Sequence, residues 1–451
     1  MLHGTSTTRA RPAAATWTNK ALGPDPEPDT GTAPCSRQWD EVGPLNTSRP
    51  SSALYTSTMT TLLGGLTPQA FLDAHWQKKA LLVRQAIPGF TGFVSRDDLI
   101  ALARRQDVVS RLVTTKKARL RVQPGPMSTS AAKLGEGPWS ILVQGIEGLV
   151  PGGWELLRQF EAIVPRARLD DLMISYATVG AGVGPHTDLY DVFLLQGPGR
   201  RRWQISTQTF SVDDDAEVPS LQGFVAEDDF ILEPGDMLYL PPGVAHHGVA
   251  VDGPCFTYSI GAVAPSVEGL LQNFLGFLSQ KVEAQVDLAA MYSDPDLQAP
   301  TTTVPAHVIS DGMSRRVQSI LDPLRFGPAD VDEFLGRLMT GPKPTVVFQV
   351  PRRPPGQSDV RDLLQKPGTL QLTLPTRGLR RGRQLFLNGD LIDFADDNKA
   401  DSHADLALCS QLIEQRALSL PLPSPPSDAL TAVVTDAIER GFLVIVGLPK
   451  P

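Results

Sequence analysis

Cysteines, long apolar runs and positive charge are all scarce in this sequence, and each shortage excludes a class of protein. The 451 residues contain three cysteines, Cys35, Cys255 and Cys409, which lie far apart and form no CxxC pair. This pattern supports neither a disulfide framework nor a structural zinc site, and it favours a reducing cytoplasm. No run approaches the roughly 20 apolar residues that span a bilayer, so no membrane protein is expected.

Positive charge is in deficit, because the formal net charge is -8. A negative balance argues against nonspecific affinity for nucleic acid and fits a basic substrate better. The C-terminal part does contain a basic cluster, which we interpret as a solvated face, so no direct DNA binding is expected. Its members are Arg377, Arg380, Arg381 and Arg383.

The length predicts two or three domains. We expect an N-terminal leader without catalytic or binding residues to precede them. Residues 1–58 are rich in Pro, Ser, Thr, Gly and Ala, which predicts disorder. The leader has no apolar segment of the secretory kind, and Met59 is a candidate translation start.

Residues 59–265 combine a few helices with many short strands. Thr67 before Pro68, and Ser95 further on, are expected to cap helices, and residues 154–163 form an amphipathic pattern. The strand-like runs that follow are separated by Gly and Pro turns, which is typical of a barrel or sandwich. A cupin jelly roll is the expected architecture, because its mouth can hold a metal between facing strands.

The hydrophobic period changes after Pro265. Residues 266–340 follow helical spacing, with Pro328 opening the last helix, and their apolar stripes indicate either core packing or a dimer interface. Residues 341–451 mix helices and short strands, including a hairpin at Asn388-Gly389. This mixture suits a small winged-helix domain, so the whole chain is expected to be α+β.

Two histidines and a carboxylate are the strongest sign of chemistry. His186 and Asp188 are two residues apart, which places both side chains on one face of a strand, and His246 follows 60 residues after His186. A lone histidine is usually structural, but two His and one carboxylate form the facial triad of non-haem Fe(II) oxygenases. His247 should point to the opposite face, as a surface residue.

Charged and aromatic residues next to this triad have two possible interpretations. The run 200–202 contains three arginines, which alone would be a solvated edge, but near a metal one Arg can clamp a dicarboxylate through two hydrogen bonds. Tyr190 and Asp191 could pack or lie on the surface, or they could face the barrel mouth and meet the substrate.

The motifs together resemble the bacterial YcfD-like ribosomal oxygenases of the JmjC/cupin superfamily, which hydroxylate arginine. The resemblance is dense from about residue 60 to 265 and weaker afterwards. The segments that carry it are 170–176 (DDLMISY), 182–193 (GVGPHTDLYDVF), 196–203 (QGPGRRRW), 241–246 (PPGVAH) and 258–261 (YSIG).

The resemblance implies a JmjC-type double-stranded β-helix at 59–265, a helical dimerisation region at 266–340 and a winged helix at 341–451 that does not bind DNA. It also implies hydroxylation of an arginine side chain in large-subunit ribosomal protein number sixteen, with Fe(II), 2-oxoglutarate and molecular oxygen. The protein would be a cytoplasmic homodimer.

Residue roles follow from the same resemblance. His186, Asp188 and His246 match iron ligands, and Arg201 matches the arginine that binds the distal carboxylate of 2-oxoglutarate. The remaining matches are Ser175, Thr257 and Ser259 for the cosubstrate and Asp171 and Tyr190 for the substrate arginine.

Three alternatives remain open at the level of sequence. The substrate could be a histidine of a ribosomal protein. The chain could be a metal-binding cupin without oxygenase activity. It could also be a nucleic-acid-associated regulator that acts through residues 341–451, which would then bind DNA or RNA with a steep salt dependence.

Overall fold

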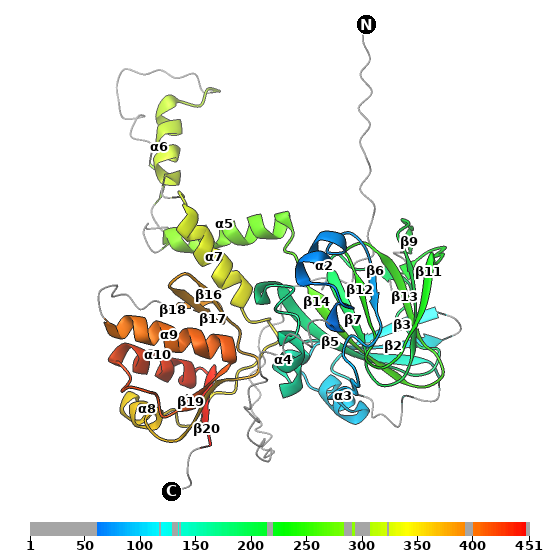
Figure 1. The fold of residues 1–451 in the computed structure, drawn as a ribbon. Coiled ribbons are helices and arrows are strands. Elements are labelled where there is room, and N and C mark those ends of the chain that lie inside the picture. The colour runs from blue at the N-terminus through cyan, green and yellow to red at the C-terminus, as the bar shows by residue number, and fades with distance from the viewer. Residues whose placement is uncertain are drawn as a thin grey trace. The chain divides into compact units, whose positions relative to one another are not determined.

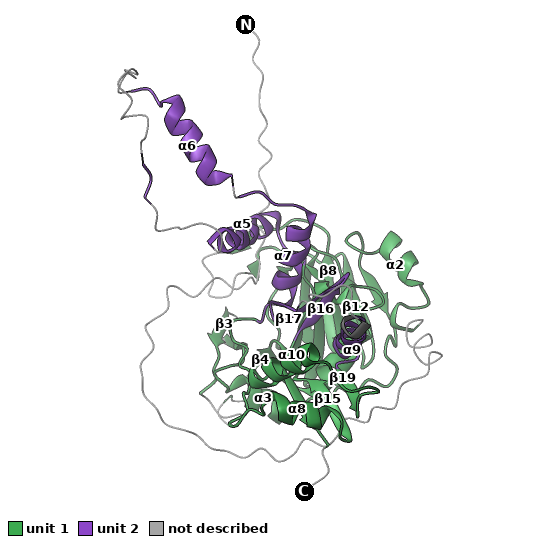
Figure 2. Ribbon diagram, turned by 90° about the vertical axis from the view of Figure 1, so that its left-hand side faces the viewer, with its two compact units in different colours: residues 1–263, 343–376, 417–451 green, residues 264–342, 377–416 purple. Residues whose placement is uncertain are grey.

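The computed structural model describes residues 61–116, 119–128, 134, 137–213, 220–283, 291–293, 307–322, 324–392 and 400–447. The predicted disordered leader, residues 1–58, lies outside them. Two units are distinguished in Figure 2. Unit 1 contains residues 1–263, 343–376 and 417–451, and unit 2 contains residues 264–342 and 377–416. The domain boundaries expected from the sequence stay predictions.

Unit 1 is built around two antiparallel sheets between which the chain passes repeatedly (Figure 1). One sheet contains the order β12-β7-β14-β5, and the other has the order β11-β8-β13-β6. Strands that are neighbours in space are therefore distant in sequence, as in a jelly roll. The predicted double-stranded β-helix is confirmed. Its strands are β5 (Leu169–Ala177), β6 (His186–Thr187), β7 (Asp191–Gln196), β8 (Arg201–Ser206), β11 (Asp228–Leu232), β12 (Met237–Leu240), β13 (Ala245–Ala250) and β14 (Cys255–Ala262).

The first of these sheets is extended on both sides by N-terminal strands, giving the order β1-β12-β7-β14-β5-β4-β2-β3. A separate pair, β9 (Val212–Asp213) and β10 (Ser220–Leu221), completes the described strands of this part. The added strands are β1 (Leu81–Val83), β2 (Ser110–Lys116), β3 (Arg119–Pro124) and β4 (Trp139–Val143).

Three of the described α-helices precede or accompany the barrel, and two of them begin at the predicted caps. Thr67 caps α2 (Pro68–Ala74), and Ser95 forms a capping box on α3 (Arg96–Ala103). The helix predicted over residues 154–163 is misplaced, because α4 spans Pro151–Arg158. Proline at the first helical position starts this helix early, despite the two glycines that follow.

Strand β7 lies within the core of the barrel, because both of its faces are buried. Phe193 belongs to the main core and lies 6.0 Å from the ring of Phe71 on α2 and 5.0 Å from Tyr239 on β12. Val192 and Leu194 point to the other side, toward the space between the sheets. A strand buried on both faces reads as a continuous apolar run, which is how residues 192–195 read here.

The C-terminal part of unit 1 is a small sheet, β19-β15-β20, with two helices. The longer of these helices is α10, which spans Asp428–Glu439. The indole N–H of Trp154 on α4 donates to the carbonyl of Leu374 at 2.8 Å, which joins this part to the barrel's helices. The other elements are α8 (Gln357–Leu364), β15 (Gly368–Leu372), β19 (Ala417–Leu420) and β20 (Leu443–Val446).

Unit 2 contains the predicted helical block, which is confirmed, and a three-stranded sheet. The predicted hairpin at Asn388-Gly389 joins β17 to β18, and both residues have positive φ (48° and 89°), as a type I′ turn requires. Within the described residues no helix is long and apolar enough to cross a bilayer. The elements are α5 (Val267–Glu283), α6 (Asp311–Leu321), α7 (Pro328–Thr340), β16 (Gly378–Arg381), β17 (Gln384–Leu387), β18 (Asp390–Ile392) and α9 (Ala400–Gln415).

Candidate functional site

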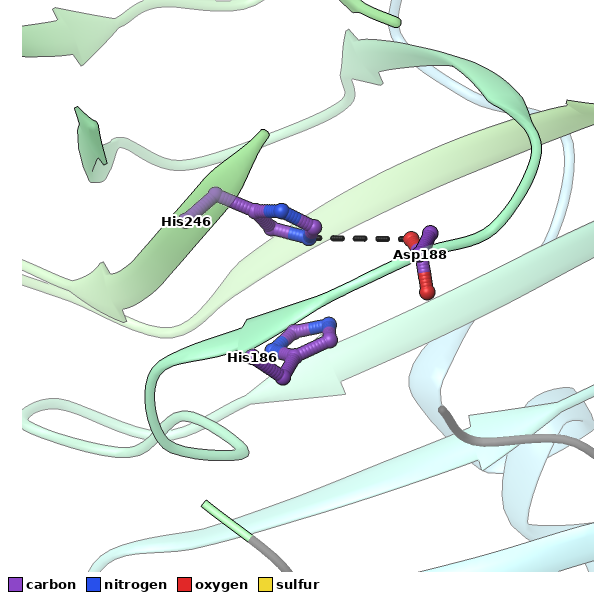
Figure 3. Close-up of side chains that lie close together, drawn as sticks. All are labelled: His186, Asp188 and His246. Carbon is purple, nitrogen blue, oxygen red and sulfur yellow. Dashed lines mark ion pairs between the residues drawn. The ribbon is translucent and has the colours of Figure 1, made fainter. Parts of the chain in front are cut away.

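The three residues singled out by the sequence converge between the two sheets (Figure 3). His186 on β6 and His246 on β13 are directly opposite each other in the antiparallel register, so their ring centroids lie 4.2 Å apart. Asp188 follows β6 and places Oδ2 3.7 Å from Nε2 of His246. One ligand atom from each residue lies within 4.8 Å of the others, a spacing that a single metal ion can bridge.

Backbone hydrogen bonds orient both imidazole rings in the same way. Nδ1 of His186 lies 3.0 Å from the carbonyl of Gly184, and Nδ1 of His246 lies 3.0 Å from the carbonyl of Val244. A carbonyl can only accept, so each Nδ1 carries the proton and each Nε2 keeps its lone pair for a metal. Burial also lowers the pKa of His186 well below its usual value, which keeps the ring neutral.

Arg201 lies on β8 with its side chain between the sheets, and the residue is 4% exposed. Its Nη1 donates to the hydroxyls of Ser175 at 3.1 Å and Thr257 at 3.0 Å. Within the described residues its Nε has no acceptor, and no carboxylate forms an ion pair with the guanidinium. A buried guanidinium without a counter-ion is costly, so the site is built to receive an anion.

A cavity of about 140 Å³ connects the triad to Arg201. Strands of both sheets line it, and the predicted residues Ser175, Ser259, Asp171 and Tyr190 are among the lining side chains. Thr257 is buried, and its hydroxyl accepts a hydrogen bond from Arg201, which lines the cavity. The structure thus brings all nine sequence-predicted site residues into one region of unit 1.

Asp171 is held in place by neighbours on its own side of the cavity. Its Oδ1 accepts from the backbone N–H of Gly145 at 2.7 Å and lies 3.3 Å from Nζ of Lys343, while Oδ2 accepts from Gln144 at 3.2 Å. Three donors fix the carboxylate but leave acceptor capacity on it. Burial raises the pKa of Tyr190, which also lines the cavity, so its hydroxyl stays protonated and able to donate.

Asp191 has a different role from its neighbour Tyr190, and the suggestion that it faces the barrel mouth is wrong. The residue is 0% exposed, and its carboxylate accepts from the hydroxyl of Tyr239 at 2.6 Å and from Gln77 at 3.1 Å. The direction of side chains alternates along β7, which turns Asp191 away from the cavity and toward the N-terminal segment. It is a buried structural carboxylate.

Replacing Asp191 should therefore destabilise the protein without acting on the site directly. We expect Asp191→Ala to lower the free energy of unfolding by about 2–4 kcal/mol, because two donors lose their buried acceptor. Asp191→Asn, which keeps one acceptor oxygen, should lose less. Urea unfolding midpoints measure both, and equal stability of Asp191→Ala and the parent would contradict this role.

Several cavity residues escaped the sequence analysis. Arg111 on β2, Gln144 after β4 and Trp203 on β8 line the cavity, and Lys343 contacts Asp171 from a proline-rich segment that reads as a linker. Only Trp203 carried a signal, as it alternates with Arg201 along one strand. His247 is partly buried rather than a surface residue, since its ring lies 6.3 Å from that of Phe224, but it does point away from the triad.

Comparison with known proteins gives matches over most of the chain. Residues 155–270 match the JmjC domain family and residues 318–411 match the ROXA-like winged helix family. The Ribosomal protein uL16 3-hydroxylase of Escherichia coli K12 is 34% identical over 329 residues, which are 72% of this chain and 84% of the relative. The human Ribosomal oxygenase 1 is 25% identical over 213 residues, covering 43% and 32% of the two chains.

Solved structures agree with these matches. A structure of E. coli YcfD superposes with a TM-score of 0.70 and 29% identity, covering 84% of this chain and 98% of that one. A second, of the same ribosomal oxygenase in complex with cobalt and 2-oxoglutarate, has a TM-score of 0.67 and 31% identity, covering 85% and 99%.

Proposed function

We propose, from the premise that this chain belongs to the YcfD-like ribosomal oxygenases of the JmjC superfamily, that it is an Fe(II)- and 2-oxoglutarate-dependent arginine hydroxylase. Its substrate would be ribosomal protein number sixteen of the large subunit (uL16). The observation that carries the proposal is the convergence of His186, Asp188 and His246 on one cavity wall, with the buried guanidinium of Arg201 further along it.

The donor set fits a ferrous ion. Two imidazole nitrogens and one carboxylate oxygen are the ligand set of non-haem Fe(II) oxygenases, and these three side chains would hold the ion while leaving room for the cosubstrate and oxygen. Bound there with 2-oxoglutarate, the iron would supply the oxidation of an unactivated C–H bond by oxygen, coupled to conversion of 2-oxoglutarate to succinate and carbon dioxide. The carbonyls of Gly184 and Val244 keep both rings aimed at that position.

The remaining cavity residues position the two organic reactants. Arg201, braced by Ser175 and Thr257, would bind the distal carboxylate of 2-oxoglutarate, and Ser259 lines the same wall. The arginine methylene that reacts has no acidic proton, so these residues need no general base. Their task is to hold the C–H bond at a fixed place and to exclude water.

An arginine side chain suits the other end of the cavity. Asp171 presents a fixed carboxylate there, and a carboxylate pairs well with a guanidinium. The hydroxyl of Tyr190 lines the same cavity and would donate a hydrogen bond that helps to hold the substrate arginine. The name of the E. coli relative points to uL16, whereas an Aedes aegypti relative that is 26% identical is called a lysine-specific demethylase and histidyl-hydroxylase.

The test of the proposed function is hydroxylation of defined peptides. We expect arginine peptides of uL16 to gain one oxygen, seen as a mass increase of about 16 Da in an iron- and 2-oxoglutarate-dependent reaction. Histidine peptides of ribosomal proteins should not react. Modification of histidine alone would reject arginine as substrate, and no turnover by the folded, iron-loaded protein would favour a cupin without oxygenase activity.

Asp171→Asn should weaken the arginine substrate specifically. The substitution keeps the shape but removes the charge that pairs with the guanidinium, so KM for the peptide should rise by about 10- to 100-fold. Turnover of 2-oxoglutarate without peptide should be unchanged. Asp170→Asn is the matched control because its side chain is 41% exposed, compared with 16% for Asp171, and a smaller effect is expected. Equal effects of both variants would contradict the assignment.

The other expected partners have separate support. Unit 2 exposes apolar side chains on its helices, and we propose that a second copy of the chain covers them in a homodimer. These side chains include Val267, Leu271, Leu275, Met313, Val317, Ile320 and Leu321. Sedimentation would show the dimer.

Arg381 on β16 is paired with Asp332 at 3.0 Å, which supports a solvated rather than a DNA-binding strand. A ribosomal protein substrate is consistent with a cytoplasmic enzyme.

A further inference from the structure

Two neighbouring inward positions of β8 each carry a buried donor without an acceptor. Nε of Arg201 and Nε1 of Trp203 make no hydrogen bond within the described residues, and both side chains line the cavity. Their residues are only 4% and 5% exposed, respectively. A buried donor that lacks a partner is destabilising and is rare in native proteins, so two on one wall indicate that a ligand supplies the acceptors.

The indole of Trp203 lies between the two functional ends of the cavity. Its ring centroid is 5.4 Å from the guanidinium carbon of Arg201 and 5.8 Å from the ring of His246. Gly248 is its cross-strand partner on β13, and a Cβ at that position would come within 2.6 Å of the indole. The glycine thus gives the indole room to lie flat along the wall between the metal ligands and the arginine.

The hydrogen bonds of Arg201 restrict where its anion can sit. Nη1 already donates to Ser175 and Thr257, so the Nε edge of the guanidinium is the part that remains for a ligand. That edge and the unpaired indole N–H belong to adjacent inward residues of one strand. A carboxylate has about four lone-pair sites, enough to accept from both residues at once.

We propose that Trp203 is a further positioning residue, whose indole N–H donates to the distal carboxylate of 2-oxoglutarate alongside Arg201. Resting against Gly248, the ring also fixes how far that carboxylate lies from the metal. The inference rests on the proposed function, because it names a contact to the cosubstrate assumed there.

The test observes the indole N–H directly in the full-length protein. Zinc replaces iron so that no turnover occurs, and the indole nitrogens of the six tryptophans are labelled with ¹⁵N. Trp203→Phe identifies one N–H signal by its loss, with Trp203→Tyr as a second variant should the first fail to fold. We expect this signal to shift when 2-oxoglutarate is added. Pyruvate, which has the same 2-oxo acid but no distal carboxylate, should leave it nearly unmoved.

Binding titrations give the second readout. Trp203→Phe should weaken 2-oxoglutarate about tenfold, equivalent to about 1.4 kcal/mol, and leave pyruvate unchanged. Trp76→Phe is the matched control, because Trp76 packs on Phe193 and Tyr239 in the main core. If the Trp203 signal does not shift with 2-oxoglutarate, or shifts equally with pyruvate, the role of Trp203 is rejected while the proposed function stands. Absence of any 2-oxoglutarate binding by the parent protein overturns the proposed function with it.

Discussion

His246→Ala is expected to abolish conversion of 2-oxoglutarate to succinate, whereas His247→Ala should keep most of it. His246 presents Nε2 to the same point as His186 and Asp188, but His247 lies on the other face of β13 beside Phe224. Loss of one of three protein ligands should weaken iron binding by at least about 100-fold, since changes to residues that merely support ligands cost about 10- to 100-fold. Succinate formation and iron content of the purified variants measure the two effects.

The adjacent pair makes a sharp control because both substitutions remove the same side chain from the same strand. General damage to β13 would lower the activity and thermal stability of both variants together. Only a ligand role predicts a large loss of iron in His246→Ala with near-normal iron in His247→Ala. The assignment fails if the two variants retain iron equally.

The barrel and its triad could be predicted from sequence because they depend on local rules. The i, i+2 spacing of His186 and Asp188 and the Gly- and Pro-rich turns between short strands are properties of adjacent residues. The pairing of His186 with His246 additionally needed the expectation of a closed barrel. The register of β6 with β13 supplies it in the structure, since it places the two residues directly opposite each other.

What the sequence could not give depends on contacts between distant segments. Nothing near Lys343 indicates that its ammonium lies 3.3 Å from Asp171, because 172 positions separate them. Asp191 shows the opposite problem, since a carboxylate next to Tyr190 and close to the HxD pair looks functional. Its burial against Tyr239 and Gln77 emerges only when the N-terminal segment packs on the barrel.

Arg201→Met is expected to raise KM for 2-oxoglutarate by about 100- to 1,000-fold, which corresponds to about 3–4 kcal/mol, the range seen when one partner of a buried charge pair is lost. Arg202→Met is the control, because that side chain is 53% exposed and pairs with Asp229 on the outer face, so its KM should stay within about twofold.

Arg201→Met, although it weakens 2-oxoglutarate binding, should raise the stability of the protein when no ligand is bound. In the described part of the chain Arg201 has hydroxyl partners but no counter-ion, so its buried charge is uncompensated, and its removal is expected to stabilise the ligand-free protein. Thermal unfolding of metal-loaded protein should therefore show Arg201→Met more stable than the parent without 2-oxoglutarate, and no longer stabilised by adding it. If Arg201→Met is less stable without ligand and still gains stability from 2-oxoglutarate, the cosubstrate carboxylate binds elsewhere and Arg201 is a structural residue of the barrel.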